Sequence, residues 1–427
     1  MKKLLGSIGS RWMMIVGYGT LLAVVGFFAF RQVSPGNAAT GKTRHYYIAA
    51  DMVDWDYAPS GKNQITGEPF DDAANVFVGS APNRIGRVYR KALYREYTDN
   101  TFTALKPIAP EWQHLGTLGP AIHAEVGDTI IVDFKNNTEL PVSIHPHGVF
   151  YNKNAEGAPY NDGTGNADKG DDGVPPGTTY TYTWQVPERA GPGPGDGSSV
   201  LWMYHSHTDE VGDSYSGLVG PMMITARGKA KEDGSPADID REFVTMFLVS
   251  DENQSPYLPE NIKNHIKAPD APPEGDEDFG ESNLMHSING YVFGNLPGLR
   301  MRVGERVRWY TIGMGTEVDL HTPHWHGQTL LMSGGQMGMR TDMVELLPGS
   351  MKILDMTPDN PGTWLFHCHV NDHILAGMLA TFTVDPQSGA PSASAGGWGS
   401  PAAAAVNTTS DALYSFYCKI TGRAHAS

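Results

Sequence analysis

The sequence predicts an all-β protein in which one β-sandwich occurs twice. Glycine and proline are frequent, with 50 and 30 of the 427 residues, and charged residues make up only 18%. The apolar runs are short and are broken by Gly, Pro, Asn and Asp, a pattern typical of strands joined by turns. An internal repeat then divides the folded region into two similar halves.

The first 43 residues are set apart from the folded region. Lys2, Lys3 and Arg11 precede an apolar stretch from Trp12 to Phe30. This is the pattern of an export signal or of an uncleaved membrane anchor. We therefore expect an extracytoplasmic protein, periplasmic or secreted, and leave open whether the segment is cut near residues 38–39.

The internal repeat pairs four segments of the chain. Residues 124–134 match residues 301–310, each with a Gly-Asp or Gly-Glu turn that leads into a strand of alternating pattern. The other pairs share His or Pro-Gly motifs: residues 144–148 with 322–327, 176–178 with 348–350, and 202–207 with 364–369. From this repeat we predict a first domain over residues 44–230 and a second over residues 231–386.

Composition also indicates which segments and functions lie outside these domains. The second copy carries an acidic insert, residues 251–281, of the kind that is usually a solvated loop. Residues 387–427 are rich in Ala, Ser and Gly and predict a disordered tail; its Cys418 is one of only two cysteines, so no disulfide framework is expected. A net charge of -16 argues against binding to nucleic acid.

Ten of the 16 histidines fall in four short motifs. The motifs are His145-x-His147, His205-x-His207, His321-x-x-His324-x-His326 and His367-Cys368-His369-x-x-x-His373. Because residues i and i+2 face the same side of a strand, each His-x-His aims two imidazoles at one point. Eight imidazoles without an intervening carboxylate suit copper, and they are His145, His147, His205, His207, His324, His326, His367 and His369.

The same strand period places Cys368 on the face opposite its two neighbouring histidines. Together with His321, His373 and Met378 it makes the ligand set of a blue-copper centre, with two imidazoles, one thiolate and a weak axial thioether. The first copy of the repeat has lost this set as a whole. Counted along the sequence, it carries Val142 for His321, Ser206 for Cys368, Val211 for His373, and Ser216 or Leu218 for Met378.

These four motifs resemble the copper signatures of multicopper oxidases, and the chain is similar in particular to the ceruloplasmin and hephaestin group. Further segments that carry the resemblance are residues 45–48, 84–94, 251–255, 281–290 and 367–378. The resemblance covers nearly all of residues 44–385. It implies two cupredoxin domains of Greek-key topology and about four coppers per subunit: one type 1 copper, and a trinuclear cluster of one type 2 and two type 3 coppers. In two-domain relatives the cluster forms between the subunits of a homotrimer.

The resemblance also implies two further metal sites. A substrate site for iron would use Glu281, His286 and Asp372, with Glu317 donated by the next subunit; alternatively, Asp372 only orients its neighbour His373 and Glu281 belongs to the acidic loop. A calcium site would use Lys153, Asp168, Asp171 and Asp172, although a solvated acidic turn explains these residues equally well.

The expected function is that of a copper oxidase. We expect one-electron oxidation of a reductant, foremost Fe(II), through the exposed edge of His321 or His373. The electrons then reduce O₂ to water at the cluster, and Cys368 and Asp372 are the expected catalytic residues. The alternatives are a laccase for phenols or amines, a cuprous oxidase using Met332, Met337, Met339 and Met343, and a copper-tolerance protein without turnover. A nitrite reductase is disfavoured because such trimers keep blue copper in the first domain.

Overall fold

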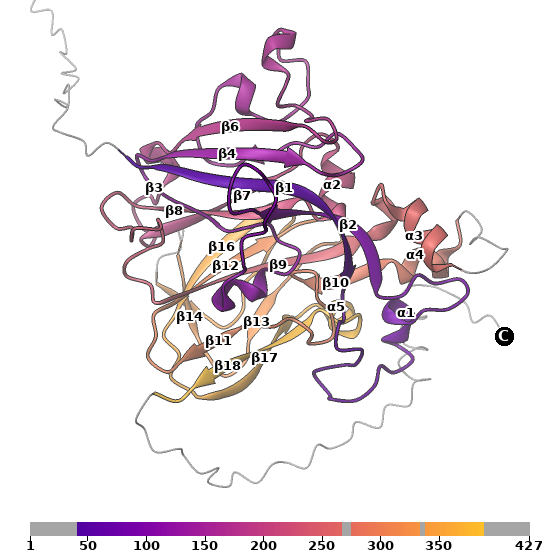
Figure 1. Ribbon diagram of the computed structural model, residues 1–427. Coiled ribbons are helices and arrows are strands. Elements are labelled where there is room, and N and C mark those ends of the chain that lie inside the picture. The colour runs from indigo at the N-terminus through magenta and orange to yellow at the C-terminus, as the bar shows by residue number, and fades with distance from the viewer. Residues whose placement is uncertain (1–40, 267–274, 334–337, 388–427) are drawn as a thin grey trace, which may run out of the picture. The chain divides into compact units, whose positions relative to one another are not determined.

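The computed structural model describes residues 41–266, 275–333 and 338–387, which all belong to one compact unit (Figure 1). These residues form four β-sheets arranged as two sandwiches, so the predicted all-β fold is confirmed. The signal or anchor segment and the tail with Cys418 fall on residues 1–40 and 388–427, outside the described residues, and stay predictions. No helix in the described ranges has the length and apolar character needed to cross a membrane.

The first sandwich consists of two four-stranded sheets. One sheet has the order β2–β1–β4–β6 and the other the order β3–β8–β7–β5. The strands are β1 (Thr43–Asp56), β2 (Val88–Glu96), β3 (Ile122–Glu125), β4 (Thr129–Asn136), β5 (His145–Pro146), β6 (Thr179–Gln185), β7 (Ser199–His205) and β8 (Val219–Thr225). The pairs β1–β4 and β3–β8 are parallel, and the other neighbours are antiparallel.

The second sandwich repeats this plan with a wider first sheet. That sheet has the order β10–β9–β12–β16–β14–β15, and the other has the order β11–β18–β17–β13. The strands are β9 (Arg241–Asp251), β10 (Leu284–Ile288), β11 (Arg300–Arg302), β12 (Val307–Gly313), β13 (Pro323–Trp325), β14 (Leu330–Met332), β15 (Met339–Thr341), β16 (Ser350–Met356), β17 (Gly362–Cys368) and β18 (Leu379–Asp385). The parallel pairs β9–β12 and β11–β18 correspond to β1–β4 and β3–β8. The predicted domain boundary at residues 230 and 231 falls between β8 and β9.

Helices in the described ranges are short and lie in the connections. The α-helices are α1 (Asn75–Val78), α2 (Glu210–Ser216), α3 (Leu258–His265), α4 (Glu277–Ser282) and α5 (Asn371–Leu375). The 3-10 helices are η1 (Pro110–Leu115), η2 (Lys153–Ala155), η3 (Asn166–Asp168), η4 (Glu188–Ala190) and η5 (Glu252–Gln254). Residues 251–281 were predicted to form a solvated loop. The described part of this insert instead contains α3 and nearly all of α4, and Asn261 and Phe279 on these helices are buried against the rest of the fold.

Strand patterns follow from what covers each face. In β4, buried and partly exposed residues alternate along the whole strand, as expected when one face lies on a core and the other meets water. In β8 all seven residues are buried. There, Met222 and Ile224 join the core of the first sandwich, whereas Val219 and Met223 join a cluster shared with the second sandwich.

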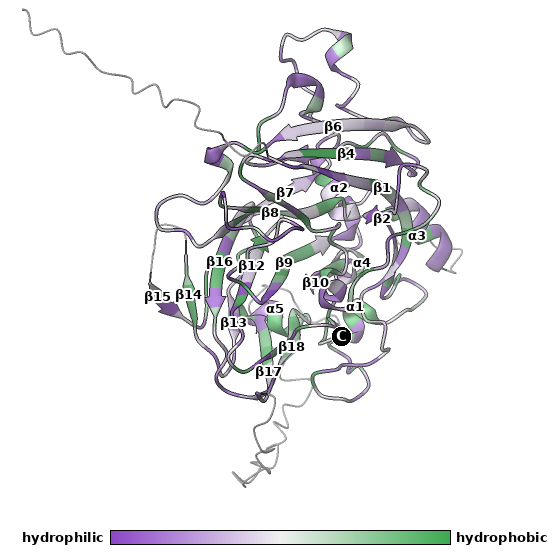
Figure 2. Cartoon of the chain, turned by 60° about the vertical axis from the view of Figure 1, so that its left-hand side comes forward, coloured by the Kyte–Doolittle hydropathy of each residue, from purple (hydrophilic) through white to green (hydrophobic). Residues whose placement is uncertain are grey.

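The two sandwiches pack through these doubly buried strands. The shared cluster contains residues of β7 and β8 from the first sandwich and residues of β9 and β12 from the second. Figure 2 shows β9 mostly in the green of apolar residues, and eight of its eleven residues are buried in succession. Such a continuous apolar run is what burial on both faces of a strand demands.

One buried ion pair also links the two sandwiches. Lys91 on β2 is 1% exposed, and Glu252 just after β9 is fully buried. The Lys91 ammonium group donates to Glu252 and, at 2.7 Å, to the carbonyl oxygen of Tyr215, while the Tyr57 hydroxyl donates to the same Glu252 oxygen. Burial raises the pKa of Glu252, and the nearby lysine opposes that increase.

Candidate metal centres

One candidate centre is a buried triad of two imidazoles and a thiol. His321 precedes β13, Cys368 ends β17, and His373 lies on α5. The Nδ1 atoms of His321 and His373 are 3.2 Å apart, and the Cys368 Sγ atom lies 3.9 and 3.5 Å from them. A metal with bonds of about 2.0–2.3 Å holds its donors at roughly these separations. Met378 is fully buried and lies three residues after the end of α5. Its N–H donates to the carbonyl oxygen of His373 at 2.9 Å.

The chemistry of this triad fits copper. Thiolate and imidazole donors together, with a thioether close by in the sequence, are the donor types of blue-copper sites. Burial raises the pKa of the Cys368 thiol, while burial and the neighbouring His321 lower the pKa of His373 to about 4. Both imidazole and thiol are therefore neutral in the metal-free protein at pH 7, and a bound cation would be needed to draw off the thiol proton.

Asp319 orients His321, and sequence reasoning missed it. One oxygen of this fully buried carboxylate lies 3.1 Å from His321 Nε2 and accepts the N–H of Val249 at 2.7 Å. The other oxygen accepts the N–H of Thr316 at 2.8 Å. With Nε2–H directed to the carboxylate, the Nδ1 lone pair of His321 points to the donor triad. A buried Asp two residues before a ligand on an extended segment is the signal that could have revealed it.

The expected exposed ring edge at this centre is absent from the described chain. His321 is 1% exposed and His373 is 4% exposed. His373 is covered by the ring of His286, whose centroid lies 5.2 Å away, and His286 is covered in turn by Phe77 at 5.6 Å. The expectation of direct electron entry at a solvent-exposed edge of either ligand was therefore wrong for the isolated chain.

The first sandwich fills the corresponding position with a hydrogen-bonded plug. The N–H of Leu218 donates to the carbonyl oxygen of Asp213, as that of Met378 does to His373, so Asp213 rather than Val211 is the counterpart of His373. The difference arises because α2 has seven residues and α5 has five. Ser206, the counterpart of Cys368, donates its hydroxyl proton to Asp213 at 2.5 Å. Burial raises the pKa of Asp213 to about 6.

A second candidate centre is the imidazole quartet of the first sandwich. His145 on β5 lies opposite His205 on β7, and His147 and His207 follow two residues later on each side. The Nε2 atoms of His147 and His205 are 3.1 Å apart, and ring centroids within the quartet are 5.2–5.6 Å apart. Burial and the neighbouring imidazoles lower the pKa of His147 to about 4. At pH 7 it is therefore an unprotonated donor.

The second sandwich holds a matching quartet. His324 on β13 lies opposite His367 on β17. The Nε2 atom of His367 lies 3.3 Å from His324 Nδ1 and 3.0 Å from His326 Nε2. The Nδ1 atom of His367 lies 2.7 Å from the carbonyl oxygen of Cys368 and donates to it, so its Nε2 lone pair faces the quartet. His369 is exposed and lies 5.5 Å from the His367 ring.

The two quartets are separate within one chain. Every ring contact between these eight imidazoles joins two members of the same sandwich, as far as the described ranges extend. Six of the eight rings are partly or fully exposed, so each quartet opens at a surface. Each quartet could therefore supply one half of a larger metal cluster.

The proposed iron ligands lie in two places. His286 on β10 contacts His373, and the exposed carboxylate of Asp372 is close enough to raise the pKa of both imidazoles, against the dominant effect of burial. Glu281 is partly exposed on α4, three residues before the start of β10. Glu317 is exposed, and its charge acts on Tyr215 of the first sandwich. The role of these four residues in iron binding stays a prediction.

Two of the proposed calcium residues, Lys153 and Asp172, take part in an ion-pair network. Lys153 and Lys169 both reach Asp162, at 3.4 and 2.8 Å, and Lys169 also pairs with Asp172 at 3.5 Å. Asp171 is fully buried; one of its oxygens accepts the N–H of Gly157 at 2.7 Å, and the other has no hydrogen-bond partner among the described residues. Asp168 is exposed. Calcium binding stays a prediction that competes with these lysines.

The methionines named for a cuprous site lie on one hairpin. Met332 on β14 pairs with Met339 on β15, and Met343 pairs with His324. Met332 is 3% exposed and belongs to the core, whereas Met339 and Met343 are 42% and 39% exposed. Met337 lies outside the described residues. One buried and two exposed thioethers do not amount to a defined site.

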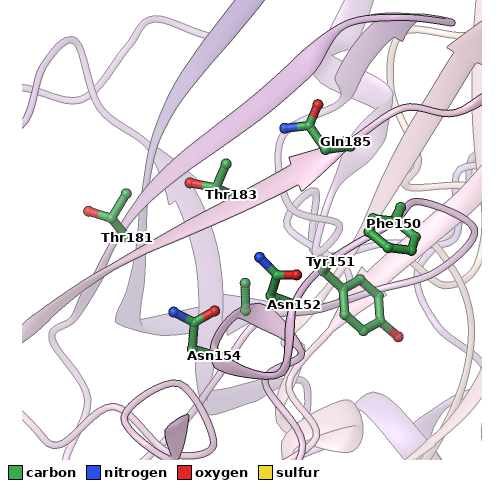
Figure 3. Close-up of a pocket in the computed structure, with 8 residues that line it drawn as sticks. Phe150, Tyr151, Asn152, Asn154, Thr181, Thr183 and Gln185 are labelled. Atoms are coloured by element: carbon green, nitrogen blue, oxygen red, sulfur yellow. The ribbon is translucent and has the colours of Figure 1, made fainter. Parts of the chain in front are cut away.

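A small polar cavity lies beside the first quartet. Figure 3 shows Thr181, Thr183 and Gln185 of β6 on one side of it and Asn152 and Asn154 on the neighbouring segment. Its volume is about 210 Å³, and its wall includes Tyr151, whose ring contacts His145 at 5.9 Å. Cavities that bind organic ligands usually have roughly 300–1,000 Å³. This cavity is therefore too small for an organic substrate.

Fold and site together define a copper-binding protein of two sandwiches, one of which carries the donors of a blue-copper centre. Two family models, both described as "Multicopper oxidase", match residues 115–229 and 264–388, together more than half of the chain. The chain belongs to the multicopper oxidase family.

Comparison with curated proteins places the chain near the ceruloplasmin and hephaestin group. It is 48% identical over 346 residues to Ferroxidase HEPHL1 of Homo sapiens, 44% over 359 residues to human hephaestin, and 42% over 343 residues to human ceruloplasmin. The matches cover 80%, 82% and 80% of this chain but only 29%, 30% and 30% of those proteins. The chain thus spans about three-tenths of the length of these relatives.

Solved structures share the fold at low sequence identity. The multicopper oxidase mgLAC matches with a TM-score of 0.50 and 20% identity, covering 80% of this chain and 86% of that chain. A copper nitrite reductase from Nitrosomonas europaea matches with a TM-score of 0.50 and 17% identity, covering 80% and 94%. At such identities the likeness concerns the fold alone.

Proposed function

We propose that this chain is a copper oxidase that takes electrons one at a time from Fe(II) and uses them to reduce O₂ to water. The observation that carries the proposal is the segment His367–Cys368–His369, in which the thiol of the buried triad stands between two imidazoles of a quartet. Copper, when bound, supplies one-electron transfer at the triad and O₂ reduction at the quartets. The backbone of these three residues is the direct covalent link between the two sites.

Each side chain has a defined part in this proposal. His321, Cys368, His373 and Met378 would hold the blue copper, and Asp319 fixes the tautomer of His321. The eight quartet imidazoles would hold the remaining three coppers. Burial lowers the pKa of His147, His205 and His367 to about 4, so these three are neutral at pH 7. Asp372, exposed beside His373, supplies a hard oxygen donor that favours Fe(III) over Fe(II) and so favours the loss of an electron.

Fe(II) is favoured over a phenol by two observations. One of the relatives described above, which is 48% identical to this chain, is named Ferroxidase HEPHL1. In addition, the rings that a bulky aromatic reductant would have to touch are buried, with His321 at 1% and His373 at 4% exposure. A copper-tolerance protein without turnover would take up no O₂ with either reductant, so O₂ uptake separates that alternative.

We further propose that the quartets of neighbouring subunits meet in a homotrimer. Each sandwich offers four imidazoles at a surface, and exposed apolar side chains flank both quartets. Phe150, three residues after His147, is 52% exposed, and Met343, opposite His324, is 39% exposed. Exposed apolar groups beside an incomplete metal site are what a subunit interface would cover. An extracytoplasmic location, with residues 1–43 as signal or anchor, is part of the same proposal.

The central test is the Cys368→Ser variant of the copper-loaded protein. We expect it to lose the blue absorbance and the oxidation of Fe(II) while it retains about three of four coppers per chain. Cys418→Ser is the matched control, because it removes the other cysteine, and it should leave colour and turnover unchanged. Unchanged turnover in Cys368→Ser would refute the proposed site. Light scattering tests the assembly: a monomer with all its copper bound would refute the trimer.

A further inference from the structure

A long segment of the first sandwich covers the second one near the buried triad. Residues 57–87, between β1 and β2, leave the first sandwich and contain α1; we refer to them as the β1–β2 excursion. The N–H of Val292 donates to the carbonyl oxygen of Tyr57 at 3.0 Å, and that of Gln64 donates to Phe293 at 2.9 Å. A Cβ atom on Gly294 would lie 2.7 Å from the side chain of Ile65. The excursion is thus tightly anchored to the second sandwich.

Apolar packing fixes the tip of this excursion. Phe77 on α1 is 8% exposed and belongs to a cluster with Phe279, Met285 and Phe293 of the second sandwich. In Figure 1, α1 lies beside α4, with which it is in contact. The position of the Phe77 ring is therefore set by both sandwiches and does not depend on a loose loop.

The Phe77 ring closes a stack of three rings that ends at the buried triad. Phe77 meets the His286 ring edge-on at 5.6 Å, and His286 meets the His373 ring at 5.2 Å. His286 is itself 9% exposed. Its Nδ1–H donates to the carbonyl oxygen of Leu284 at 3.0 Å, which leaves the Nε2 lone pair free. The outermost imidazole of the stack is therefore covered by an apolar ring.

This cover affects two kinds of reductant differently. A planar phenol exchanges electrons by lying against an exposed ligand ring, and the stack leaves no such surface. A metal ion needs only a few donor atoms, and the exposed Asp372 beside His373 offers oxygen donors at the edge of the stack. The geometry therefore separates reductants by size and by charge.

We propose that Phe77 determines substrate specificity: it excludes planar aromatic reductants from the His286–His373 ring pair and so reserves the centre for metal ions. The proposal rests on the proposed oxidase function and extends it to the basis of selectivity. It assigns to the first sandwich, which lacks the blue-copper donors, a role at the centre of the second.

The test compares Phe77→Ala with Phe70→Ala in the copper-loaded protein. Phe70 lies on the same excursion and packs on Phe293 at 5.7 Å, and no ring contact joins it to His286. Phe77→Ala should raise kcat/KM for a dimethoxyphenol at least tenfold and change that for Fe(II) less than twofold. Phe70→Ala should leave the ratio of the two values unchanged. Phe77→Leu, which keeps an apolar side chain in the cluster, should give an intermediate rise and serves if the alanine variant does not fold.

Chemical labelling of His286 gives a readout that does not depend on turnover. Diethyl pyrocarbonate should modify His286 several times faster in Phe77→Ala than in wild type or Phe70→Ala, measured by peptide mass spectrometry. An unchanged phenol-to-iron ratio in Phe77→Ala, or an equal rise in Phe70→Ala, would overturn the proposal. If wild type oxidises Fe(II) but Phe77→Ala gains no phenol activity, only the selectivity proposal fails. If wild type oxidises no Fe(II) but the variant gains phenol activity, the selectivity proposal stands and Fe(II) as substrate fails.

Discussion

Replacing Asp319 by asparagine tests whether this carboxylate holds the His321 ligand. The carboxylate accepts three hydrogen bonds, from His321 Nε2 at 3.1 Å, Val249 at 2.7 Å and Thr316 at 2.8 Å. An asparagine amide has one oxygen and one NH₂ group. If its oxygen faces His321 and Val249, its NH₂ faces the Thr316 N–H, and two donors oppose each other. The flipped orientation is worse, because NH₂ then faces two donors.

The expected cost follows from the donor left without an acceptor. A buried donor without a partner costs about 1–3 kcal/mol. Asp319→Asn should therefore lower the free energy of unfolding of the copper-free protein by about 1–3 kcal/mol, measured by chemical denaturation. His321 keeps an acceptor, so the blue absorbance should survive. Loss of the negative charge makes His321 a weaker donor, so the reduction potential of the bound copper should rise.

The matched control for this variant is Asp385→Asn. Asp385 pairs with Arg300 at 2.5 Å, but the Arg300 side chain is 67% exposed, and such surface pairs contribute only about 0–1 kcal/mol. The control should shift neither the potential nor the blue absorbance. If Asp319→Asn changes the unfolding free energy and the potential no more than Asp385→Asn does, then Asp319 does not position His321.

Three further predictions follow from buried charges and from the iron proposal. Glu252→Gln should lower the free energy of unfolding by about 3–5 kcal/mol, because Lys91 is left charged and buried, and Lys91→Met in the same chain should recover most of that loss in denaturant titrations. The copper-free protein should melt at a lower temperature at pH 5 than at pH 7. Several imidazoles have a pKa near 4 in the folded protein but the ordinary value of 6.5 in the unfolded chain, so the folded protein binds fewer protons in this window and loses stability as the pH falls. An equal or higher melting temperature at pH 5 would contradict this. The imidazoles concerned are His114, His147, His205, His286, His367 and His373. Asp372→Asn should raise KM for Fe(II) more than KM for a phenol in steady-state assays, and an equal rise for both would remove Asp372 from the iron site.

The fold and the clustering of the donors could be predicted from the sequence because both depend on local spacing. Residues two positions apart on a strand face the same side, so the imidazoles of His145-x-His147 and His205-x-His207 had to converge once their strands paired. The placement of the Cys368 and His367 side chains on opposite faces of the strand likewise followed from alternation alone. Such spacing rules carry no information about partners that are distant in sequence.

What the sequence could not reveal depends on contacts between distant segments. The excursion that brings Phe77 onto His286 joins positions more than 200 residues apart, and no periodicity links them. The counterpart of His373 was misassigned to Val211 because counting along the sequence ignored the longer α2. The backbone hydrogen bond from Leu218 to Asp213 and the lengths of α2 and α5 reveal the two-residue difference.

The plug in the first sandwich explains how this fold can keep four clustered imidazoles and dispense with the donors of a blue-copper centre. Asp213 is 3% exposed, and its carboxylate accepts from the Ser206 hydroxyl at 2.5 Å and from the Asp209 N–H at 3.1 Å. These bonds satisfy the polar groups in the space that the thiol and imidazole take in the second sandwich. Neither carboxylate nor hydroxyl is a soft donor, so this position does not offer the thiolate that blue copper requires. The flanking His205 and His207 remain in place because they lie on the other face of the strand. In the proposed oxidase, electrons would therefore enter through the second sandwich, and the first sandwich would contribute the Phe77 cover and, in the proposed trimer, half of the cluster imidazoles.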